Sequence, residues 1–478
     1  MLKNLKKRYK RFIADAVDLS SVRSELADSK KKIEELSILN KELSDVRNAI
    51  NTLALSEEKI QHSIDELHSF QKYVSYYSST PELLRLMANN KTDKKRILLC
   101  GNYGDANLGD ELMMQTLIDA FSRELDCHLT VMIYPRINYE NPNLQHVSVI
   151  HFPYNYADIS VIANCFDVVV VGGGALLEDE AYSVRELHYD NFDEYNIHHS
   201  RAIIDICNDF IEHEKPVFCL GLSTSKNVFQ NKNYLKKLSQ VAEKAKVFSL
   251  RDTNSINTLK KSGIDISNVK LCNDLVYASD YLTHNVSCAS KEKRKIGVIT
   301  LCYDQDCTKK VIINLVNSIN DEYGEENTEI TLIPFYKGII DDEKFFNELV
   351  SKNGWSNVII PSYYDVMSDL SKLLCEQDII VSSRYHGILM SLALGVPTIP
   401  VIMDLHPHYY NKVEYLLRQY GAGIEKTINF GLVAETPFSK MVKENEVEPD
   451  NSVTERLLKE TGLELEKYIA EIKRSCNY

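Results

Sequence analysis

The sequence predicts an α/β protein made of two doubly wound, Rossmann-like lobes that follow an N-terminal helical coiled coil. Three observations support this. Residues 1–90 contain no glycine and follow a heptad pattern. From residue 95 onward, short apolar runs alternate with helical stretches, as in βαβ units. A polar, strand-poor interval at 277–295 separates two such series. At roughly 150 residues per domain, a chain of 478 residues has room for about three units.

The first ninety residues favour a long helix that self-associates. A 3-4 spacing from Leu36 to Val74 places apolar residues at ten of twelve seam positions, with Glu57 and Gln71 as the exceptions. Such a sustained heptad predicts a coiled coil of roughly 58 Å at 1.5 Å per residue. We therefore predict a homo-oligomer, without a choice between dimer and trimer. The alternative is a helical hairpin that folds against the body of the same chain.

Composition and charge indicate where in the cell the protein lies and which kinds of partner it can bind. Residues 1–12 hold six Lys and Arg among apolar residues, which suits contact with an anionic membrane surface or, equally, a solvated basic tail. No apolar run is long enough to span a bilayer, and no secretory signal is visible. The 11 scattered cysteines indicate reduced thiols. We expect a cytoplasmic protein, with peripheral contact at the inner membrane face as a hypothesis. The net charge of −13 argues against a nucleic-acid partner.

The lobes are predicted from their strands in chain order. The first lobe, 95–280, has apolar runs at 96–100, 128–134, 167–174, 216–222 and 246–250, with a helix at 110–124 after the first run. The second lobe, 290–430, has runs at 296–301, 329–335, 357–361, 378–383 and 397–402. An amphipathic helix at 450–475 ends the chain. In such folds, ligands bind beyond the carboxyl ends of the strands.

The first candidate site segment, 101–111, follows the first strand. It offers four hydrogen-bonding side chains at a helix entrance, namely Asn102, Asp105, Asn107 and Asp110. Two carboxylates would repel a phosphate, so this segment favours a sugar acceptor or a general base. The alternative is that Asn107 or Asp110 caps the helix.

Two further segments follow later strands of the first lobe. The triple glycine Gly172, Gly173 and Gly174 could form a backbone nest for a ligand, or could serve close helix–sheet packing. Arg251, at the end of the run 246–250, could present a bidentate donor to a carboxylate or phosphate. Its alternative role is a structural pair with Asp252.

The most informative segment lies in the second lobe. His386 follows the strand 378–383 beside Arg384, at a strand-to-helix turn, where an imidazole can bind an anion and transfer a proton. A lone histidine is more often structural, but its neighbours favour function. Lys412 lies ahead of another helix as a further anion ligand.

These segments, in this order, resemble the polysaccharide pyruvyl transferase family from about residue 96 to 425. The resemblance implies a GT-B-like pair of lobes that transfers pyruvate from phosphoenolpyruvate to a sugar of a capsular, exopolysaccharide or cell-wall glycan precursor, commonly as a ketal. It also implies that Arg251, Arg384 and His386 form the donor-binding and catalytic set, with Lys412 as a donor ligand. The stretch before Lys412 is longer than usual, so His406 or His408 could take its place.

The residue chemistry fits this reaction. Phosphoenolpyruvate carries a carboxylate and a phosphate, and two arginines and a lysine can bind them. We expect His386 to act as general acid and Asp105 or Asp110 as general base, with Asn102, Asn107 and the triple glycine at the acceptor or cleft. Neither a metal nor a cofactor is expected besides phosphoenolpyruvate as donor substrate. The acceptor could be lipid-linked, nucleotide-linked or polymeric.

Two other functions are alternatives for this chain. A nucleotide-sugar glycosyltransferase of the same fold would hold the donor ribose with an acid, where this chain has Met390. A non-catalytic coiled-coil scaffold would have no reason to keep Arg251, Arg384 and His386. Both are therefore less favoured than a pyruvyl transferase.

Overall fold

A computed structural model describes residues 93–133, 141, 144–152, 156–179, 199–282, 293–300, 305–338, 340–403 and 407–476. Within these ranges, only the backbone is described at 156–160, 199–202, 305 and 407–408. The predicted coiled coil and the basic N-terminus lie outside the described residues. All described residues belong to one unit of the chain.

The first domain is built on a seven-stranded sheet in the order β3-β2-β1-β4-β5-β6-β7, and every neighbouring pair is parallel. Its strands are β1 (Lys95–Cys100), β2 (Cys127–Ile133), β3 (Ser148–His151), β4 (Val168–Leu177), β5 (Val217–Thr224), β6 (Val247–Leu250) and β7 (Val269–Leu271). Its helices are α5 (Leu108–Glu124), α6 (Tyr156–Cys165), α7 (His199–Glu212), α8 (Lys232–Lys244) and α9 (Thr253–Lys261), followed by the 3₁₀ turns η4 (Leu275–Ala278) and η5 (Asp280–Leu282).

The second domain has a six-stranded parallel sheet in the order β10-β9-β8-β11-β12-β13. Its strands are β8 (Arg294–Ile299), β9 (Thr328–Leu332), β10 (Val358–Ile359), β11 (Ile379–Ser382), β12 (Thr398–Ile402) and β13 (Ile428–Asn429). Its helices are α10 (Gln305–Tyr323), η6 (Glu325–Asn327), α11 (Asp342–Asn353), α12 (Tyr363–Cys375), α13 (Tyr385–Ala393), α14 (Pro407–Gln419), η7 (Ile424–Lys426), α15 (Phe430–Val433) and α16 (Phe438–Asn445).

Two parallel-sheet α/β domains are therefore confirmed, and the ten predicted strands are present with shifts of a few residues at their ends. Three strands were not predicted, β3, β7 and β13, because they are short and only partly buried. A run of two to four residues with exposed positions has no alternation strong enough to mark a strand.

Local capping fixes where several helices begin. The side chain of Asn231 accepts from the backbone N–H groups of Asn233 and Tyr234, which starts α8. Asp252 starts α9 by accepting from the N–H of Ser255 at 2.7 Å. These side chains satisfy donors that the first turn of a helix otherwise leaves without partners.

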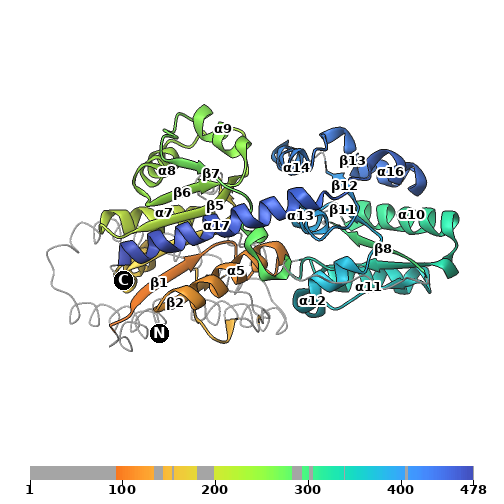
Figure 1. Cartoon of the computed structure of the whole chain (residues 1–478), viewed down its shortest axis with the longest axis horizontal. Coiled ribbons are helices and arrows are strands. Elements are labelled where there is room, and N and C mark those ends of the chain that lie inside the picture. Colours follow the sequence, from red (N-terminus) through yellow and green to blue (C-terminus); the bar gives the residue numbers. More distant parts are fainter. Residues whose placement is uncertain are drawn as a thin grey trace, which may run out of the picture. The chain divides into compact units, whose positions relative to one another are not determined.

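The final helix, α17 (Asn451–Cys476), joins the two domains (Figure 1). It begins in the second domain, where the hydroxyl groups of Thr454 and Tyr420 lie 3.2 Å apart. Near its end, Lys473 pairs with Glu124 of the first domain at 3.1 Å. The predicted amphipathic helix is present, and its apolar face is covered by both domains.

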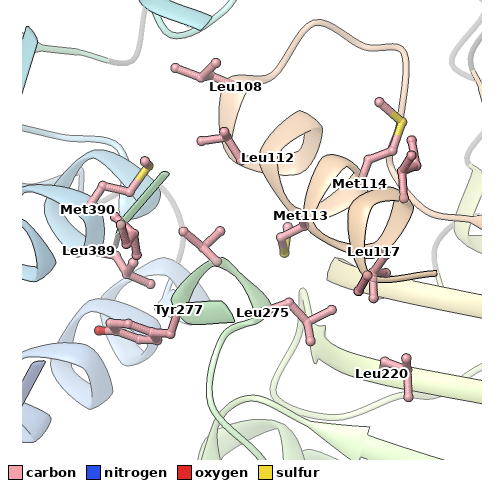
Figure 2. Close-up of a cluster of buried hydrophobic side chains, with 14 of the residues drawn as sticks. Leu108, Leu112, Met113, Met114, Leu117, Leu220, Leu275, Tyr277, Leu389 and Met390 are labelled. Atoms are coloured by element: carbon pink, nitrogen blue, oxygen red, sulfur yellow. The ribbon is translucent and has the colours of Figure 1, made fainter. Parts of the chain in front are cut away.

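One hydrophobic core continues from the first domain into the second. Figure 2 shows side chains from α5, η4 and α13 gathered in this cluster. The labelled members from these three elements are Leu108, Leu112, Met113, Met114, Leu117, Leu275, Tyr277, Leu389 and Met390. A shared apolar core fixes the relative position of two domains more firmly than a polar interface does.

Among the helices of the described residues, we find none with a stretch long and apolar enough to cross a lipid bilayer.

Candidate active site

Five charged or titratable side chains meet where strands of both sheets end. Arg251 directly follows β6, and Asp274 follows β7 as the N-cap of η4. Asp110 lies in the first turn of α5, after β1. From the second domain come His386, in the first turn of α13, and Lys412 on α14. The carboxyl ends of parallel strands are where ligands bind in folds of this kind.

Arg251, Asp274 and His386 are in direct contact across the domain boundary. A guanidinium nitrogen of Arg251 (Nη1) lies 2.5 Å from Oδ2 of Asp274 and 3.3 Å from Nε2 of His386. The same imidazole nitrogen is 3.5 Å from Oδ2 of Asp274. Nε2 of His386 can accept from the guanidinium or donate to the carboxylate, depending on its proton. The three groups therefore form one buried, ionically linked set.

The charge of Asp274 is fixed by its neighbours. Burial by itself would raise the pKa of this carboxyl group, but Arg251 and His386 outweigh that effect, and its pKa lies well below the usual range. The N–H of Val276 also donates to Asp274 at 3.0 Å. Asp274 is therefore ionised and holds Arg251 and His386 in place.

Two cationic donors in this site have no partner among the described residues. Lys412 is 8% exposed, and its ammonium group forms no hydrogen bond or ion pair with a described side chain. Burial lowers its pKa to about 8, with a further contribution from Arg251. Nε of Arg251 is also buried without a hydrogen-bond partner. Buried cationic donors without partners are costly, and an anionic ligand would satisfy them.

Asp110 is the carboxyl group of the site with basic character. It is 6% exposed, and Nδ2 of Asn102 donates to its Oδ2 at 2.6 Å. Burial raises the pKa of Asp110, although His386, Asn102 and Arg251 act in the opposite direction. A carboxylate with a raised pKa is a better proton acceptor than one at its usual value.

Gly109 brings α5 against the imidazole of His386. A Cβ atom on Gly109 would lie 1.9 Å from Nδ1 of His386, so any larger residue forces the ring to move. We expect Gly109→Ala to lower turnover about 10²-fold through misplacement of His386. The measurement is kcat with the fold checked by thermal melting. Gly462→Ala in α17 is the control, since nothing lies within 4 Å of its added methyl group. Normal turnover in Gly109→Ala would show that the imidazole position is not critical.

Asp105 and Asn107, the other two candidates of segment 101–111, contact the second domain. Oδ2 of Asp105 accepts from the hydroxyl group of Tyr336 at 3.2 Å. Asn107 pairs with Tyr336 as an isolated β-bridge and occupies the N-cap position of α5 without a side-chain cap. Of the two predicted general bases, the structure places Asp110 with His386 and Asp105 at the domain boundary.

Arg384 is held by its own domain. Its Nη2 donates to both carboxylate oxygens of Asp342, at 3.1 and 2.8 Å, and its Nε donates to the carbonyl of Thr300 at 3.0 Å. Asp342 is fully buried. The structure therefore groups Arg384 with Asp342 of its own domain, two residues before His386 along the chain.

The triple glycine serves close packing of α5 on β4. A Cβ on Gly172 would lie 2.1 Å from Leu117, and one on Gly173 would lie 2.3 Å from the sulfur of Met113. Gly173 also has a φ of 66°, a conformation that favours glycine. These two contacts show close helix–sheet packing, the second of the two roles considered for the triple glycine.

Asp274 was not predicted as a site residue, and the alternative pair of Arg251 with Asp252 gives way to a pair with Asp274. Asp252 caps α9, and Arg251 binds Asp274, 23 residues further along. A polar residue shortly after a strand was the available signal, but β7 is too short to be recognised. His406 lies outside the described residues, as does the side chain of His408. Among the described residues, no group of three or more His, Cys, Asp or Glu has an arrangement that could hold a metal.

The fold and these contacts define a two-domain α/β protein with a buried cluster of charged side chains between its domains. The family model of polysaccharide pyruvyl transferases matches residues 107–404, well over half of the chain. The chain therefore belongs to the polysaccharide pyruvyl transferase family. Asp110, Arg251, Asp274, Arg384 and His386 lie inside the match, whereas Lys412 lies just beyond it.

Solved structures similar to this chain have low sequence identity to it. No curated protein sequence matches the chain. A UDP-GlcNAc 2-epimerase from Neisseria meningitidis, solved with UDP-GlcNAc, is similar at 11% identity and a TM-score of 0.47, over 79% of this chain and all of the other. A glycosyltransferase from Rickettsia africae is similar at 10% identity and a TM-score of 0.45, over 80% of this chain and 99% of the other.

Proposed function

We propose that this protein transfers pyruvate from phosphoenolpyruvate to a sugar of a capsular, exopolysaccharide or cell-wall glycan precursor, as a ketal. The observation that supports this most directly is the pair of buried cationic donors, Nζ of Lys412 and Nε of Arg251, that have no partner among the described residues. A small ligand with two anionic groups would satisfy both donors, and phosphoenolpyruvate has a carboxylate and a phosphate.

The proposed reaction needs one proton donor and one proton acceptor. Protonation of the methylene carbon of phosphoenolpyruvate gives an oxocarbenium-like centre, which one sugar hydroxyl attacks. The bond between that carbon and the phosphate oxygen then breaks, and a second hydroxyl of the same sugar closes the ketal. The two hydroxyl protons balance the one taken up by the methyl group and the one that leaves with phosphate.

The site offers suitable groups for both proton transfers. His386 is the proposed general acid, because an imidazole can donate a proton and its Nε2 lies within the charged set, 3.5 Å from Oδ2 of Asp274. Asp110 is the proposed general base for the sugar hydroxyl, because its burial raises its pKa. Arg251 and Lys412 would bind the donor and offset the charge that develops on the leaving phosphate.

The binding of phosphoenolpyruvate by the wild type and by Lys412→Met tests this proposal. Loss of one charge-assisted hydrogen bond is expected to weaken binding roughly 10- to 150-fold, or 1.5–3 kcal/mol. Isothermal titration calorimetry measures both affinities, with Lys440→Met as control, because Lys440 is more than half exposed and pairs only with Glu444 at 3.9 Å. Equal affinities for the wild type and Lys412→Met would remove Lys412 from the donor site.

The pH dependence of phosphoenolpyruvate binding should follow the titration of Lys412. Its pKa of about 8 implies that donor affinity falls as the pH rises from 7 to 9.5, with proton uptake on binding near pH 8. The second ionisation of a phosphate monoester has a pKa of about 6 and adds negative charge as the pH rises, so the ligand does not cause this fall. Titrations in two buffers of different ionisation enthalpy report the proton uptake, which should be absent in Lys412→Met.

The stability of the folded chain should rise with pH over the range in which donor affinity falls. Because the pKa of Lys412 is lower in the folded chain than in the unfolded chain, its charge lowers the stability below pH 8. That cost disappears as the pH rises from about 8 to 10.5. Lys412→Met should therefore melt higher than the wild type at pH 7 while it binds the donor more weakly.

The glycosyltransferase alternative receives no support from the site. Met390 is fully buried in the core shared by the two domains (Figure 2), away from solvent. Thermal melting with nucleoside diphosphates and with phosphoenolpyruvate separates the two functions, since only the true donor class should raise the melting temperature. Stabilisation by a nucleoside diphosphate alone would overturn the present proposal.

A further inference from the structure

One buried carboxylate of the second domain organises a contact that reaches into the first. Oδ2 of Asp342 accepts from the backbone N–H groups of Phe335 at 3.0 Å and Tyr336 at 2.9 Å, and from Arg384 at 2.8 Å. The N–H of Asp342 in turn donates to the carbonyl of Tyr336 at 2.9 Å. Asp342 is fully buried, and it fixes the backbone of the segment 335–337.

That segment binds the start of α5 in the other domain. The N–H of Leu108 donates to the carbonyl of Phe335 at 3.0 Å, and the N–H of Lys337 donates to the carbonyl of Ala106 at 3.1 Å. We call these contacts, together with the hydrogen bond from Tyr336 to Asp105 at 3.2 Å, the interdomain bridge. The second domain thus supplies the acceptor for the first N–H of α5, which the helix itself cannot satisfy.

The interdomain bridge lies next to both proposed proton-transfer groups. Asp110 follows Leu108 by two residues in the first turn of α5. His386 follows Arg384 by two residues, and Arg384 is bound to Asp342. Gly109, between Leu108 and Asp110, packs directly against the ring of His386. One chain of contacts therefore leads from Asp342 to Asp110 on one side and to His386 on the other.

A different contact joins the domains beside the donor-binding cations. Nδ2 of Asn254, on α9 near Arg251, donates to the carbonyl of Asn411 at 3.0 Å, and Asn411 directly precedes Lys412. The side chain of Asn411 donates to Asn227 at 3.2 Å. The relative placement of Arg251 and Lys412 thus has its own support, separate from the interdomain bridge.

We propose that Asp342 is a positioning residue that sets the distance between Asp110 and His386 through the interdomain bridge, and that Arg384 serves this role as its buried counter-ion. Loss of the Asp342 charge leaves donor binding largely supported by the Asn411 contact and impairs proton transfer. The kinetic part of this inference rests on the proposed function, whereas the structural part does not.

Hydrogen–deuterium exchange followed by mass spectrometry tests the structural part without any substrate. In Asp342→Asn, amide exchange in the peptide that contains residues 105–109 should be about tenfold faster or more, since the Leu108 amide loses its fixed acceptor. Exchange in β1 and β4 should match the wild type. A carboxylate that only stabilised its own domain would change exchange near 335–342 alone, and that result would overturn the proposal.

Two further variants serve as controls for the exchange experiment on Asp342→Asn. Tyr336→Phe removes only the hydroxyl group of the bridge and should accelerate exchange at 105–109 to a smaller extent, which decides the matter if Asp342→Asn does not fold. Asn254→Ala weakens the other interdomain contact and should leave exchange at 105–109 unchanged. Acceleration in Asn254→Ala equal to that in Tyr336→Phe would indicate general domain separation and overturn the specific role of Asp342.

Kinetics supplies the second readout. Asp342→Asn should lower kcat about tenfold or more while it changes the dissociation constant of phosphoenolpyruvate by less than about threefold. A parallel loss of donor affinity would overturn the separation between the two contacts. If the wild type itself neither binds nor turns over phosphoenolpyruvate, the proposed function fails, and the exchange experiment still decides the role of Asp342.

Discussion

Replacing Asp274 by alanine is expected to lower the free energy of unfolding by about 3–5 kcal/mol, because it leaves the buried guanidinium of Arg251 without its carboxylate. Arg251 and Asp274 are both at least 95% buried, and their 2.5 Å contact has no solvent to replace it. Chemical denaturation at pH 7 measures the loss. A change below 1 kcal/mol would show that water or another group compensates Arg251.

Two comparisons identify the cause of that loss. The double variant Arg251→Met with Asp274→Leu removes both charges and should recover much of the stability, since a buried ion pair gains little over apolar groups of similar size. Glu460→Ala breaks the surface pair with Arg456, whose side chains are more than half exposed, and should change stability by less than about 0.5 kcal/mol.

Acidity provides an independent check on Asp274. Because its pKa is lower in the folded than in the unfolded chain, the unfolded carboxyl group binds protons first as the pH falls. Its stabilising contribution is complete above the ordinary carboxyl pKa of about 4 and decreases below it. The difference in stability between the wild type and Asp274→Ala should therefore shrink below about pH 4.

Replacing His386 by alanine is expected to lower kcat about 10²- to 10⁴-fold, the range for loss of a general acid. Donor affinity should fall much less, since Arg251 and Lys412 remain. Phosphate release from phosphoenolpyruvate, measured with a panel of lipid-linked, nucleotide-linked and polymeric sugars, gives kcat once an acceptor is found. Thermal melting should change little, because the contact between Arg251 and Asp274 stays intact.

A surface histidine provides the control for this variant. His213, near the end of α7, is about 39% exposed and contacts the backbone oxygen and the carboxylate of Asp209. His213→Ala should keep full turnover. Turnover of His386→Ala within threefold of the wild type would assign the acid to another group, and Asp110 would be tested next because burial raises its pKa.

Several features of this protein could be predicted because they depend on short stretches of chain. Apolar runs such as 167–174 and 378–383 mark buried parallel strands wherever they lie in the fold. Arg251 directly follows such a run and His386 lies three residues after another, and the carboxyl ends of parallel strands meet at one edge of a sheet. Their position in the site was therefore predictable before any contact was known.

The ion-pair partners of these side chains, which lie far away in the sequence, could not be predicted in the same way. Asp274 follows a strand of three residues, and its choice of Arg251 and His386 depends on how β6, β7 and α13 meet in space. Arg384 and Arg251 are both arginines that follow strands, yet Arg384 binds Asp342 of its own domain. Sequence spacing does not record which carboxylate a guanidinium reaches.

Ten of the thirteen strands in the described part of the chain, the motifs of the family and the cationic residues near strand ends could be read from the sequence alone. Only the tertiary structure decided that Asp110, and not Asp105, lies with His386, and that α17 and the interdomain bridge join the domains. The physical reason is that periodicity and turn chemistry are local, whereas ion pairing and burial depend on groups brought together from both domains.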